Sequence, residues 1–326
     1  PKIITLYDPA CGSGGMLTES REYLLDLGVR SAAIQLSGTE INPETYAICK
    51  SDLIIKGVDP SGIHWGNTIT DNSFSDKSFG YMITNPPYGK SWKEDKKKIY
   101  HEKMLLDHRF ELTLTNYIGE EEVLDSTPRT SDGQLLFLLE EVDKMKPLEF
   151  QPQGSRIASI HNGSSLFTGD AGSGESNIRR YLIEKDLVEA IIQLPNNIFY
   201  NTGISTYVWM LTNKKKDNRK GKVQLIDASQ AFEKLRKNQG SRNCTIEPYR
   251  TDILRVYTDF VEQEANEELK VGSKIFDDDD FRYYNVTIER PLRLRCQFNS
   301  LKIDEMLYDS SDIEVSKLSL IHISEP

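Results

Sequence analysis

The sequence predicts an α/β fold in which helices cover both faces of a mostly parallel β-sheet. Short apolar runs alternate with segments of helical periodicity through the first half of the chain. Two of these runs end in glycine-rich or proline-rich turns, at 8–15 and 85–89. Parallel strands need long crossover connections, usually helices, so this alternation is typical of a parallel sheet. Two later runs, 206–211 and 222–227, flank a lysine-rich segment and predict a hairpin that adds one antiparallel strand.

The individual elements follow from their apolar content and from the residues that begin each helix. Pro43 stands in the first turn of an expected helix, where its missing N–H has no intrahelical partner. The polar stretch 89–130 is expected to be a functional or mobile loop. In chain order, the expected strands are 3–7, 33–40, 63–65, 79–84, 156–160, 187–193, 206–211 and 222–227, and the expected helices are 14–28, 43–56, 134–145 and 177–185.

The composition narrows the class of protein. With 326 residues, the chain can form one large domain or two small ones. Forty Lys and Arg against 50 Asp and Glu give a charge of −10, which argues against a stand-alone nucleic-acid binder because phosphate contacts need cations. No apolar run approaches the ~18 residues of a membrane helix, so no membrane partner is expected. Without CxxC or HxxxH spacings, we expect no metal and a reduced, cytoplasmic protein.

A glycine-rich turn, Asp-Pro-Ala-Cys-Gly-Ser-Gly-Gly at 8–15, follows the first expected strand and opens the first helix. Glycines let a ligand approach the backbone, and the helix N-terminus offers unpaired N–H groups. A dinucleotide site would need a third glycine where Leu17 stands and an acidic residue about 20 positions on, whereas the first acidic strand-end residue is Glu40. A P-loop is excluded because no Gly-Lys-Ser/Thr follows.

Acidic residues at the ends of the first two strands favour a different ligand. Asp8 is placed to accept a hydrogen bond from an ammonium group, and Glu40 is placed to accept from two ribose hydroxyls. An ammonium group and a ribose without a phosphate describe S-adenosylmethionine, whose sulfonium cation also tolerates an acidic pocket. The turn and the two acids therefore predict S-adenosylmethionine as the cofactor.

The most specific motif is Asn-Pro-Pro-Tyr at 85–88, directly after the fourth expected strand. The two prolines fix two φ angles and remove two backbone donors, so the carbonyl of Pro86 is held beside the side-chain oxygen of Asn85. Two converging acceptors can bind a planar NH₂ group and aim its nitrogen lone pair at a methyl group. This chemistry needs no covalent enzyme intermediate. Tyr88 is expected to stack on the planar substrate.

With these motifs in order, the sequence resembles the amino-methylating DNA methyltransferases and, more closely, the modification (M) subunit of type I restriction–modification systems. The resemblance covers roughly residues 1–295. It implies a Rossmann-like S-adenosylmethionine-dependent methyltransferase fold with a mostly parallel seven-stranded sheet, one antiparallel strand, helices on both faces and a mainly helical C-terminal region. Besides the two motifs above, it rests on 38–42, 66–68, 132–134, 161–163, 194–195, 199–203 and 289–293.

The resemblance also implies a role for each matching residue. The target base would be flipped out of the duplex, because its amino group is otherwise buried. The implied base contacts are Asn85, Pro86 and Tyr88, with Phe199 as a second aromatic contact. The implied cofactor residues are Asp8, Gly12 and Gly14 at the methionine and ribose end, Glu40 on the ribose, Ile41 on the adenine and Asn67 near it, together with Pro9 and Ala10 of the turn.

The activity that the resemblance implies is methyl transfer to the N6 amino group of adenine in double-stranded DNA. The implied partners are double-stranded DNA, a specificity subunit, a second modification subunit and a restriction (helicase–nuclease) subunit. Two alternatives stay open. One is another Asn-Pro-Pro-Tyr amino-methyltransferase, acting on protein glutamine, RNA or N4 of cytosine. The other is an inactive, truncated assembly subunit.

Two regions are expected along the chain. Residues 1–230 would form the methyltransferase catalytic domain, and 231–326 a mainly helical region that packs on the core or on a partner. Because the first expected strand begins at residue 3 of a chain that starts with Pro1, we expect a fragment that lacks an N-terminal helical domain and an upstream cofactor motif. The last residues, 318–326, carry no turn or cap signal.

Overall fold

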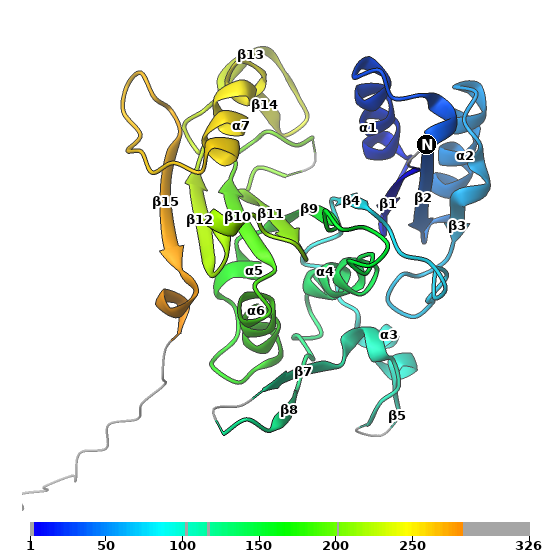
Figure 1. The fold of residues 1–326 in the computed structure, drawn as a ribbon. Coiled ribbons are helices and arrows are strands. Elements are labelled where there is room, and N and C mark those ends of the chain that lie inside the picture. Colours follow the sequence, from blue (N-terminus) through cyan, green and yellow to red (C-terminus); the bar gives the residue numbers. More distant parts are fainter. Residues whose placement is uncertain (1–2, 102–103, 116–117, 201, 283–326) are drawn as a thin grey trace, which may run out of the picture. The chain divides into compact units, whose positions relative to one another are not determined.

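The computed structural model describes residues 3–101, 104–115, 118–200 and 202–282 (Figure 1). Its centre is a nine-stranded sheet with the strand order β15-β12-β10-β11-β9-β4-β1-β2-β3. These strands are β1 (Ile4–Asp8), β2 (Ile34–Glu40), β3 (Ile63–Trp65), β4 (Tyr81–Thr84), β9 (Arg156–Asn162), β10 (Val188–Gln193), β11 (Thr206–Thr212), β12 (Lys222–Asp227) and β15 (Gly272–Asp277).

Most neighbouring strands in this sheet are parallel. β3, β2, β1, β4 and β9 pair in parallel, and so do β10 and β12. β11 is antiparallel to both β9 and β10, and β15 is antiparallel to β12. The mostly parallel α/β class is therefore confirmed. The expected seven strands with one antiparallel are corrected to nine strands with two antiparallel in the described part of the chain.

The expected hairpin between β11 and β12 is wrong. β10 lies between these two strands and pairs with both of them. The connection 213–221 is long enough to cross the end of β10. The chain can therefore place β11 between β9 and β10 and still continue to β12 on the far side of β10. There both edges of β11 gain hydrogen-bonded neighbours, whereas an edge position would leave one row of backbone groups unpaired.

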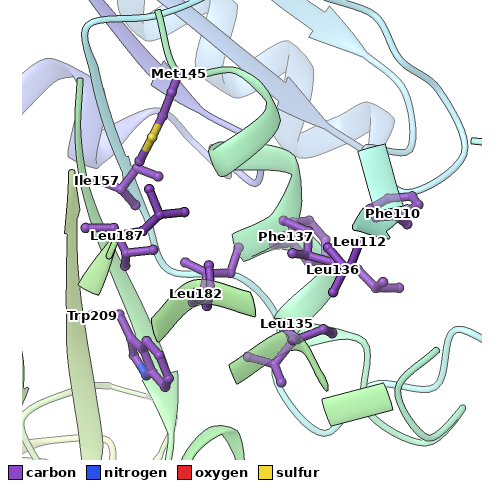
Figure 2. Close-up of a cluster of buried hydrophobic side chains, with 14 of the residues drawn as sticks. Phe110, Leu112, Leu135, Leu136, Phe137, Met145, Ile157, Leu182, Leu187 and Trp209 are labelled. Carbon is purple, nitrogen blue, oxygen red and sulfur yellow. The ribbon is translucent and has the colours of Figure 1, made fainter. Parts of the chain in front are cut away.

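Helices cover both faces of the sheet. One face presents Tyr7 and Met82 to α4 and α6 in the largest buried cluster, part of which Figure 2 shows. The other face presents Leu6 to α1 and α2, and Ile192 to α7. The helices are α1 (Gly15–Asp26), α2 (Pro43–Ile55), α3 (Lys93–Ile99), α4 (Gln134–Asp143), α5 (Ser164–Phe167), α6 (Gly174–Glu184) and α7 (Arg250–Asp259). No helix among the described residues is both long enough and apolar enough to span a bilayer.

The stretch 89–130, expected as a polar loop, is folded where the structure describes it. Phe110, Leu112 and Leu114 are buried and alternate with polar residues. Alternating apolar and polar residues, the pattern that predicts a strand, are therefore present in this segment. The high overall polarity of the segment led to the prediction of a loop. The segment forms α3 and two small antiparallel pairs, β5 (Tyr100–His101) with β6 (Met104–Leu105) and β7 (Leu112–Thr115) with β8 (Glu121–Leu124).

The described part of the C-terminal region is not mainly helical, contrary to expectation. It contains the antiparallel pair β13 (Glu233–Gln239) and β14 (Arg242–Thr245), then α7 and β15. The acidic run Asp277–Asp280 ends β15 and forms a short 3-10 turn. β15 covers the free edge of β12 with a full antiparallel ladder. The expected motif at 289–293 lies outside the described residues.

Candidate active site

A cavity of about 370 Å³ lies at the carboxyl edge of the sheet, where β1, β2 and β4 end. The chain runs from β1 to β2 and β3 on one side and returns to β4 on the other side of β1. Such a switch point is the usual ligand position in open α/β sheets. A larger cavity, about 730 Å³, lies against β10, β12 and β15, and no predicted site residue lines it. The predicted residues in the wall of the smaller cavity are Pro9, Ala10, Glu40, Ile41, Asn67 and Asn85.

Asp8, at the end of β1, lies behind the cavity wall and is 1% exposed. Its Oδ1 accepts hydrogen bonds from the backbone N of Ala10 (2.9 Å) and from Oγ1 of Thr84 (2.6 Å). Burial raises the pKa of Asp8 to about 7, because a low-dielectric environment disfavours the charged form. Asp8 therefore fixes the start of the glycine-rich turn and joins it to β4, the strand that precedes Asn85.

Gly12 and Gly14 set the path of the backbone from β1 into α1. Their φ angles are 55° and 84°, a left-handed conformation that glycine adopts without strain. A Cβ atom on Gly14 would lie 2.7 Å from Sγ of Cys49 on α2. The close approach of the turn to α2 therefore requires glycine at this position as well. Neither glycine belongs to the cavity wall.

Glu40 ends β2 and connects the glycine-rich turn to α2. Its Oε2 accepts from the backbone N of Gly12 (3.0 Å), and its Oε1 accepts from the backbone N of Asn42 (2.7 Å). Each carboxylate oxygen keeps a second lone pair for a ligand hydroxyl. Ile41, 52% exposed, presents an apolar side chain in the same wall. An acceptor pair and an apolar surface thus lie next to each other.

Asn67, in the loop after β3, is hydrogen-bonded within the protein at both side-chain polar atoms. Its Oδ1 accepts from the backbone N of Ile69 (3.0 Å), and its Nδ2 donates to Oδ1 of Asp95 on α3 (2.7 Å). Asp95 and Trp92 bring the segment after β4 into the cavity wall. Neither residue was predicted from the sequence. The sequence feature that could have indicated them is the presence of an aromatic and an acidic residue, Trp92 and Asp95, in a run that is otherwise rich in lysine.

Arg109 anchors the loop after β3. Its side chain is fully buried and donates to the carbonyl oxygens of Thr68 (2.7 Å) and Ile69 (3.0 Å). It also pairs with the carboxylates of Asp107 and Glu140. Burial acts to lower the pKa of Arg109, but the two carboxylates outweigh it and raise that pKa. A permanently charged guanidinium therefore joins this loop to α4.

Asn85, immediately after β4, has a buried side-chain oxygen in the wall of the cavity. Its Oδ1 has no hydrogen-bond partner among the described residues. Pro86 is buried, Pro87 lines the cavity, and Tyr88 is half-buried, which raises the pKa of its hydroxyl. An unpaired buried acceptor costs about 1–3 kcal/mol. Such a group in a cavity wall can be satisfied by a ligand that donates a hydrogen bond.

A buried polar network supports the chain just after the Asn-Pro-Pro-Tyr motif. The backbone N of Gly89 donates to Oδ1 of Asp132 (3.0 Å), whose Oδ2 accepts from Nε2 of Gln134 (2.7 Å) and Oγ of Ser164 (2.9 Å). Oε1 of Gln134 lies 3.1 Å from Nδ1 of His161. Burial lowers the pKa of His161 to about 3, so its ring stays neutral and links β9 to α4.

Phe199 lies outside the cavity wall, in the loop between β10 and β11. The strand register places that loop at the same edge of the sheet as Asn85. Thr84 pairs with Ser159 of β9, and three residues further along β9, Asn162 pairs with Thr206, the first residue of β11. The structure therefore brings Phe199 to the correct edge but does not join it to the cavity.

Residues 2–293 match the family model for N-6 DNA methylases. The chain belongs to this family. Two curated relatives of this chain are the methylase subunits of the type I restriction enzymes MjaVII and MjaIX from Methanocaldococcus jannaschii. They are 32% identical over 229 residues and 29% identical over 236 residues. These alignments cover 70% and 72% of this chain, but only 36% and 38% of the relatives.

A solved structure supports the same grouping. The type I restriction–modification methyltransferase subunit from Streptococcus thermophilus superposes with a TM-score of 0.65 at 25% identity. That match covers 86% of this chain and 52% of the other chain. The predicted resemblance to type I modification subunits and the methyltransferase fold are thus confirmed. The chain spans about half, or less, of the length of the relatives it matches.

Proposed function

We propose that the protein containing this chain transfers a methyl group from S-adenosylmethionine to the N6 amino group of adenine in double-stranded DNA. It would do so as the modification subunit of a type I restriction–modification system. The observation that carries this proposal is the buried Oδ1 of Asn85, which has no partner among the described residues and lies in the cavity wall. The family match and the type I methylase relatives support this class of reaction.

The geometry around Asn85 suits an aromatic amino group as the nucleophile. Such a group is a weak nucleophile, because its lone pair is delocalised into the ring. Oδ1 of Asn85 and the carbonyl oxygen of Pro86 would each accept one N–H, which shifts the nitrogen toward tetrahedral geometry. The bonds from Thr84 to Asp8 and from Gly89 to Asp132 hold this segment at both ends before a substrate arrives. Fixed acceptors need no reorganisation during the reaction, which is the basis of preorganised catalysis.

Aromatic side chains would hold the target base once it leaves the duplex. A paired and stacked adenine cannot place its amino group between the two acceptors and the methyl donor, so the base must be flipped into the site. Tyr88, half-buried beside Asn85 in the sequence, is the first stacking surface. Phe199 is proposed as the second, which requires the loop between β10 and β11 to approach the cavity when DNA is bound.

The donor set in the wall fits S-adenosylmethionine. Glu40 offers acceptors to two ribose hydroxyls, Ile41 offers an apolar surface to the adenine, and Asn67 lies in the same wall. Pro9 and Ala10 supply the surface of the glycine-rich turn. Asp8, when ionised behind this turn, favours a cationic ligand. When bound, the cofactor supplies the methyl group, which its sulfonium charge activates.

The intact protein would act in the cytoplasm as part of a complex with double-stranded DNA. The other members are a specificity subunit, a second modification subunit and a restriction (helicase–nuclease) subunit. The net charge of −10 supports this arrangement, because most of the DNA affinity must then come from a more basic partner. Within this chain, we assign catalysis to residues 1–230 and contacts with the core or a partner to 231–326.

The test is methyl transfer by the full-length protein, purified with the subunits it assembles with. Labelled methyl should appear on N6 of adenine in duplex DNA. Asn85→Ala should lower kcat by roughly 10²–10³-fold, as for loss of one preorganised hydrogen-bonding group, and should largely retain cofactor binding. The matched control is Asn218→Ala, an exposed asparagine in the turn before β12.

Other results would replace this proposal. Label only in protein glutamine, in RNA or on N4 of cytosine would assign that acceptor instead. Loss of cofactor binding in Asn85→Ala would refute the role of Asn85 as a base contact. No transfer by the wild-type complex would favour an inactive assembly subunit.

A further inference from the structure

The β13–β14 hairpin concentrates positive charge in an acidic chain. Residues 233–245 contain Lys234, Arg236, Lys237 and Arg242 against Glu233, which is four cations minus one anion, or +3, whereas the whole chain carries −10. Lys234, Arg236 and Lys237 are exposed and form no ion pair with any described residue. The hairpin therefore presents cationic charge to the surroundings of the molecule.

A second basic segment of the chain behaves differently. The connection between β11 and β12 contains four lysines, but carboxylates of this chain neutralise part of its charge. Lys215 pairs with Asp186 (2.5 Å), and Lys220 pairs with Asp217 (2.7 Å). The three exposed cations of the hairpin lack such partners within the described residues. Their charge is available to an external polyanion.

The hairpin is bonded directly to the loop that carries Phe199. The backbone N of Ser241 donates to the carbonyl oxygen of Tyr200 (2.9 Å), and the backbone N of Asn243 donates to that of Asn197 (3.0 Å). Nη1 of Arg242 donates to the hydroxyl of Tyr200 (2.8 Å), and its guanidinium lies 5.2 Å from the centre of the same ring. Hairpin and loop thus form one packed unit.

This unit lies at the edge of the sheet where Asn85 lies. β11 is antiparallel to both β10 and β9, and β9 is parallel to β4, so β10 and β4 run in the same direction. The loop after β10 therefore leaves the sheet at the same edge as Asn85. The lysine-rich connection from β11 to β12 lies at the opposite edge, because it joins the end of β11 to the start of β12.

We propose that the β13–β14 hairpin binds phosphates of double-stranded DNA next to the flipped base. Lysine and arginine contacts to phosphates position a duplex without reading its sequence. Because the hairpin is bonded to the loop of Phe199, phosphate binding would also hold that loop against the extruded base. This inference rests on the proposed function and names the element of this chain that contacts the DNA backbone.

The experiment replaces Lys234, Arg236 and Lys237 together by glutamine in the full-length protein, purified with its partner subunits. Each lost phosphate contact reduces the slope of log affinity against log salt by about 0.9, so the variant should lose up to about 3 in slope. At physiological salt, this corresponds to roughly 10–100-fold weaker binding. Specific and unrelated duplexes should be affected equally. The midpoint of urea unfolding should not change, because the three side chains are exposed.

A charge-matched control is available at the opposite edge of the sheet. Lys214→Gln, Lys216→Gln and Lys220→Gln together remove the same charge from exposed positions and should leave slope and affinity unchanged. An unchanged slope in the hairpin variant would overturn the proposal. So would an equal loss in the control, which would indicate a general effect of net charge, or a loss confined to the specific duplex, which would indicate base contacts.

Methyl transfer by the wild-type complex, measured in the same preparations, separates two kinds of failure. If the wild type methylates adenine in DNA and the hairpin variant keeps its salt slope, only the hairpin proposal fails. If the wild type transfers methyl groups only to protein or RNA, the proposed function fails, and the hairpin proposal fails with it.

Discussion

Two loops line the same cavity and differ in how their polar groups are satisfied. In the loop after β3, both side-chain polar atoms of Asn67 are bonded within the protein, to Ile69 and Asp95. In the segment after β4, Oδ1 of Asn85 is buried with no partner in the described part of the chain. Both residues are asparagines that follow the carboxyl ends of parallel strands in one sheet, β3 and β4.

The difference separates groups that build the site from groups that perform its chemistry. A side chain such as that of Asn67, whose two polar atoms are bonded within the protein, keeps its position with or without a ligand. An unpaired buried acceptor reduces the stability of the free protein and gains a partner only when a donor enters. Mutation of Asn67 is thus expected to change stability, and mutation of Asn85 is expected to change turnover.

The largest effect is expected for Arg109→Ala, which removes the anchor of the loop after β3. The substitution leaves Glu140 and two carbonyl oxygens without their buried donor. Breaking a buried ion pair by removing one partner typically costs about 3–5 kcal/mol. Urea unfolding should show this loss. The control Arg180→Ala removes surface pairs with Glu184 and Glu122 and should cost about 1 kcal/mol or less. Equal effects of the two changes would contradict the anchoring role.

The next effect concerns Asp8, which joins the glycine-rich turn to the strand before Asn85. Its pKa is about 7 in the folded protein, against about 4 in an unfolded chain. Between about pH 4 and pH 7 the folded state binds the proton of Asp8 more tightly than the unfolded state does. Asp8 therefore lowers the free energy of unfolding as the pH rises through this range, and its contribution no longer changes above about pH 7. Asp8→Asn keeps the acceptor for Thr84 and Ala10 but cannot ionise.

The free energy of unfolding of Asp8→Asn should therefore rise relative to wild type with increasing pH. The expected slope is up to about 1.4 kcal/mol per pH unit, or about 2–3 kcal/mol between pH 5 and pH 7. Urea titrations at pH 5, 6, 7 and 8 measure this difference. Parallel stability curves for the two proteins would show that Asp8 is ionised throughout and that no acidic group with a raised pKa joins the turn to β4.

A smaller loss of stability is expected for Asn67→Ala. The change leaves the backbone N–H of Ile69 and the carboxylate of Asp95 without their partner, which costs about 1–3 kcal/mol. Asn67→Asp restores the acceptor for Ile69 but places two carboxylates against each other, so it should be at least as destabilising. Thermal unfolding of both variants at neutral pH measures this. A stable Asn67→Asp variant would mean that the bond to Asp95 contributes little.

Much of the first half of the fold could be predicted from the sequence, because strong local signals bound each element. α2 was expected at 43–56 and spans Pro43–Ile55, with Asn42 accepting from the backbone N of Glu44 as the N-cap. The neighbours of β11 could not be predicted. Periodicity shows that a strand exists, but the strands beside it depend on contacts between residues far apart in sequence.

The candidate site divides in the same way. Glu40 and Asn85 stand at strand ends within motifs, so parallel-sheet geometry alone brings them to one edge. Asp95 and Trp92 reach the cavity only because a long insertion folds back over it. The burial of Asp8 behind the wall was also not predictable, since it depends on the hydroxyl of Thr84 from a strand 76 residues away.

The smallest effect on stability, and the sharpest contrast, is expected for Asn85→Ala. Removing an acceptor that has no partner should leave the free energy of unfolding unchanged or raise it by up to about 1 kcal/mol, because the desolvation cost of that group disappears. The same substitution at Asn67 should lower it. Urea unfolding of both variants in one buffer, without cofactor or DNA, measures the difference in sign. If Asn85→Ala lost as much stability as Asn67→Ala, Oδ1 of Asn85 would have a partner within the folded protein, and the two loops would not differ in kind. If Asn85→Ala instead loses turnover without losing stability, the oxygen of Asn85 contributes binding energy only when the substrate is bound.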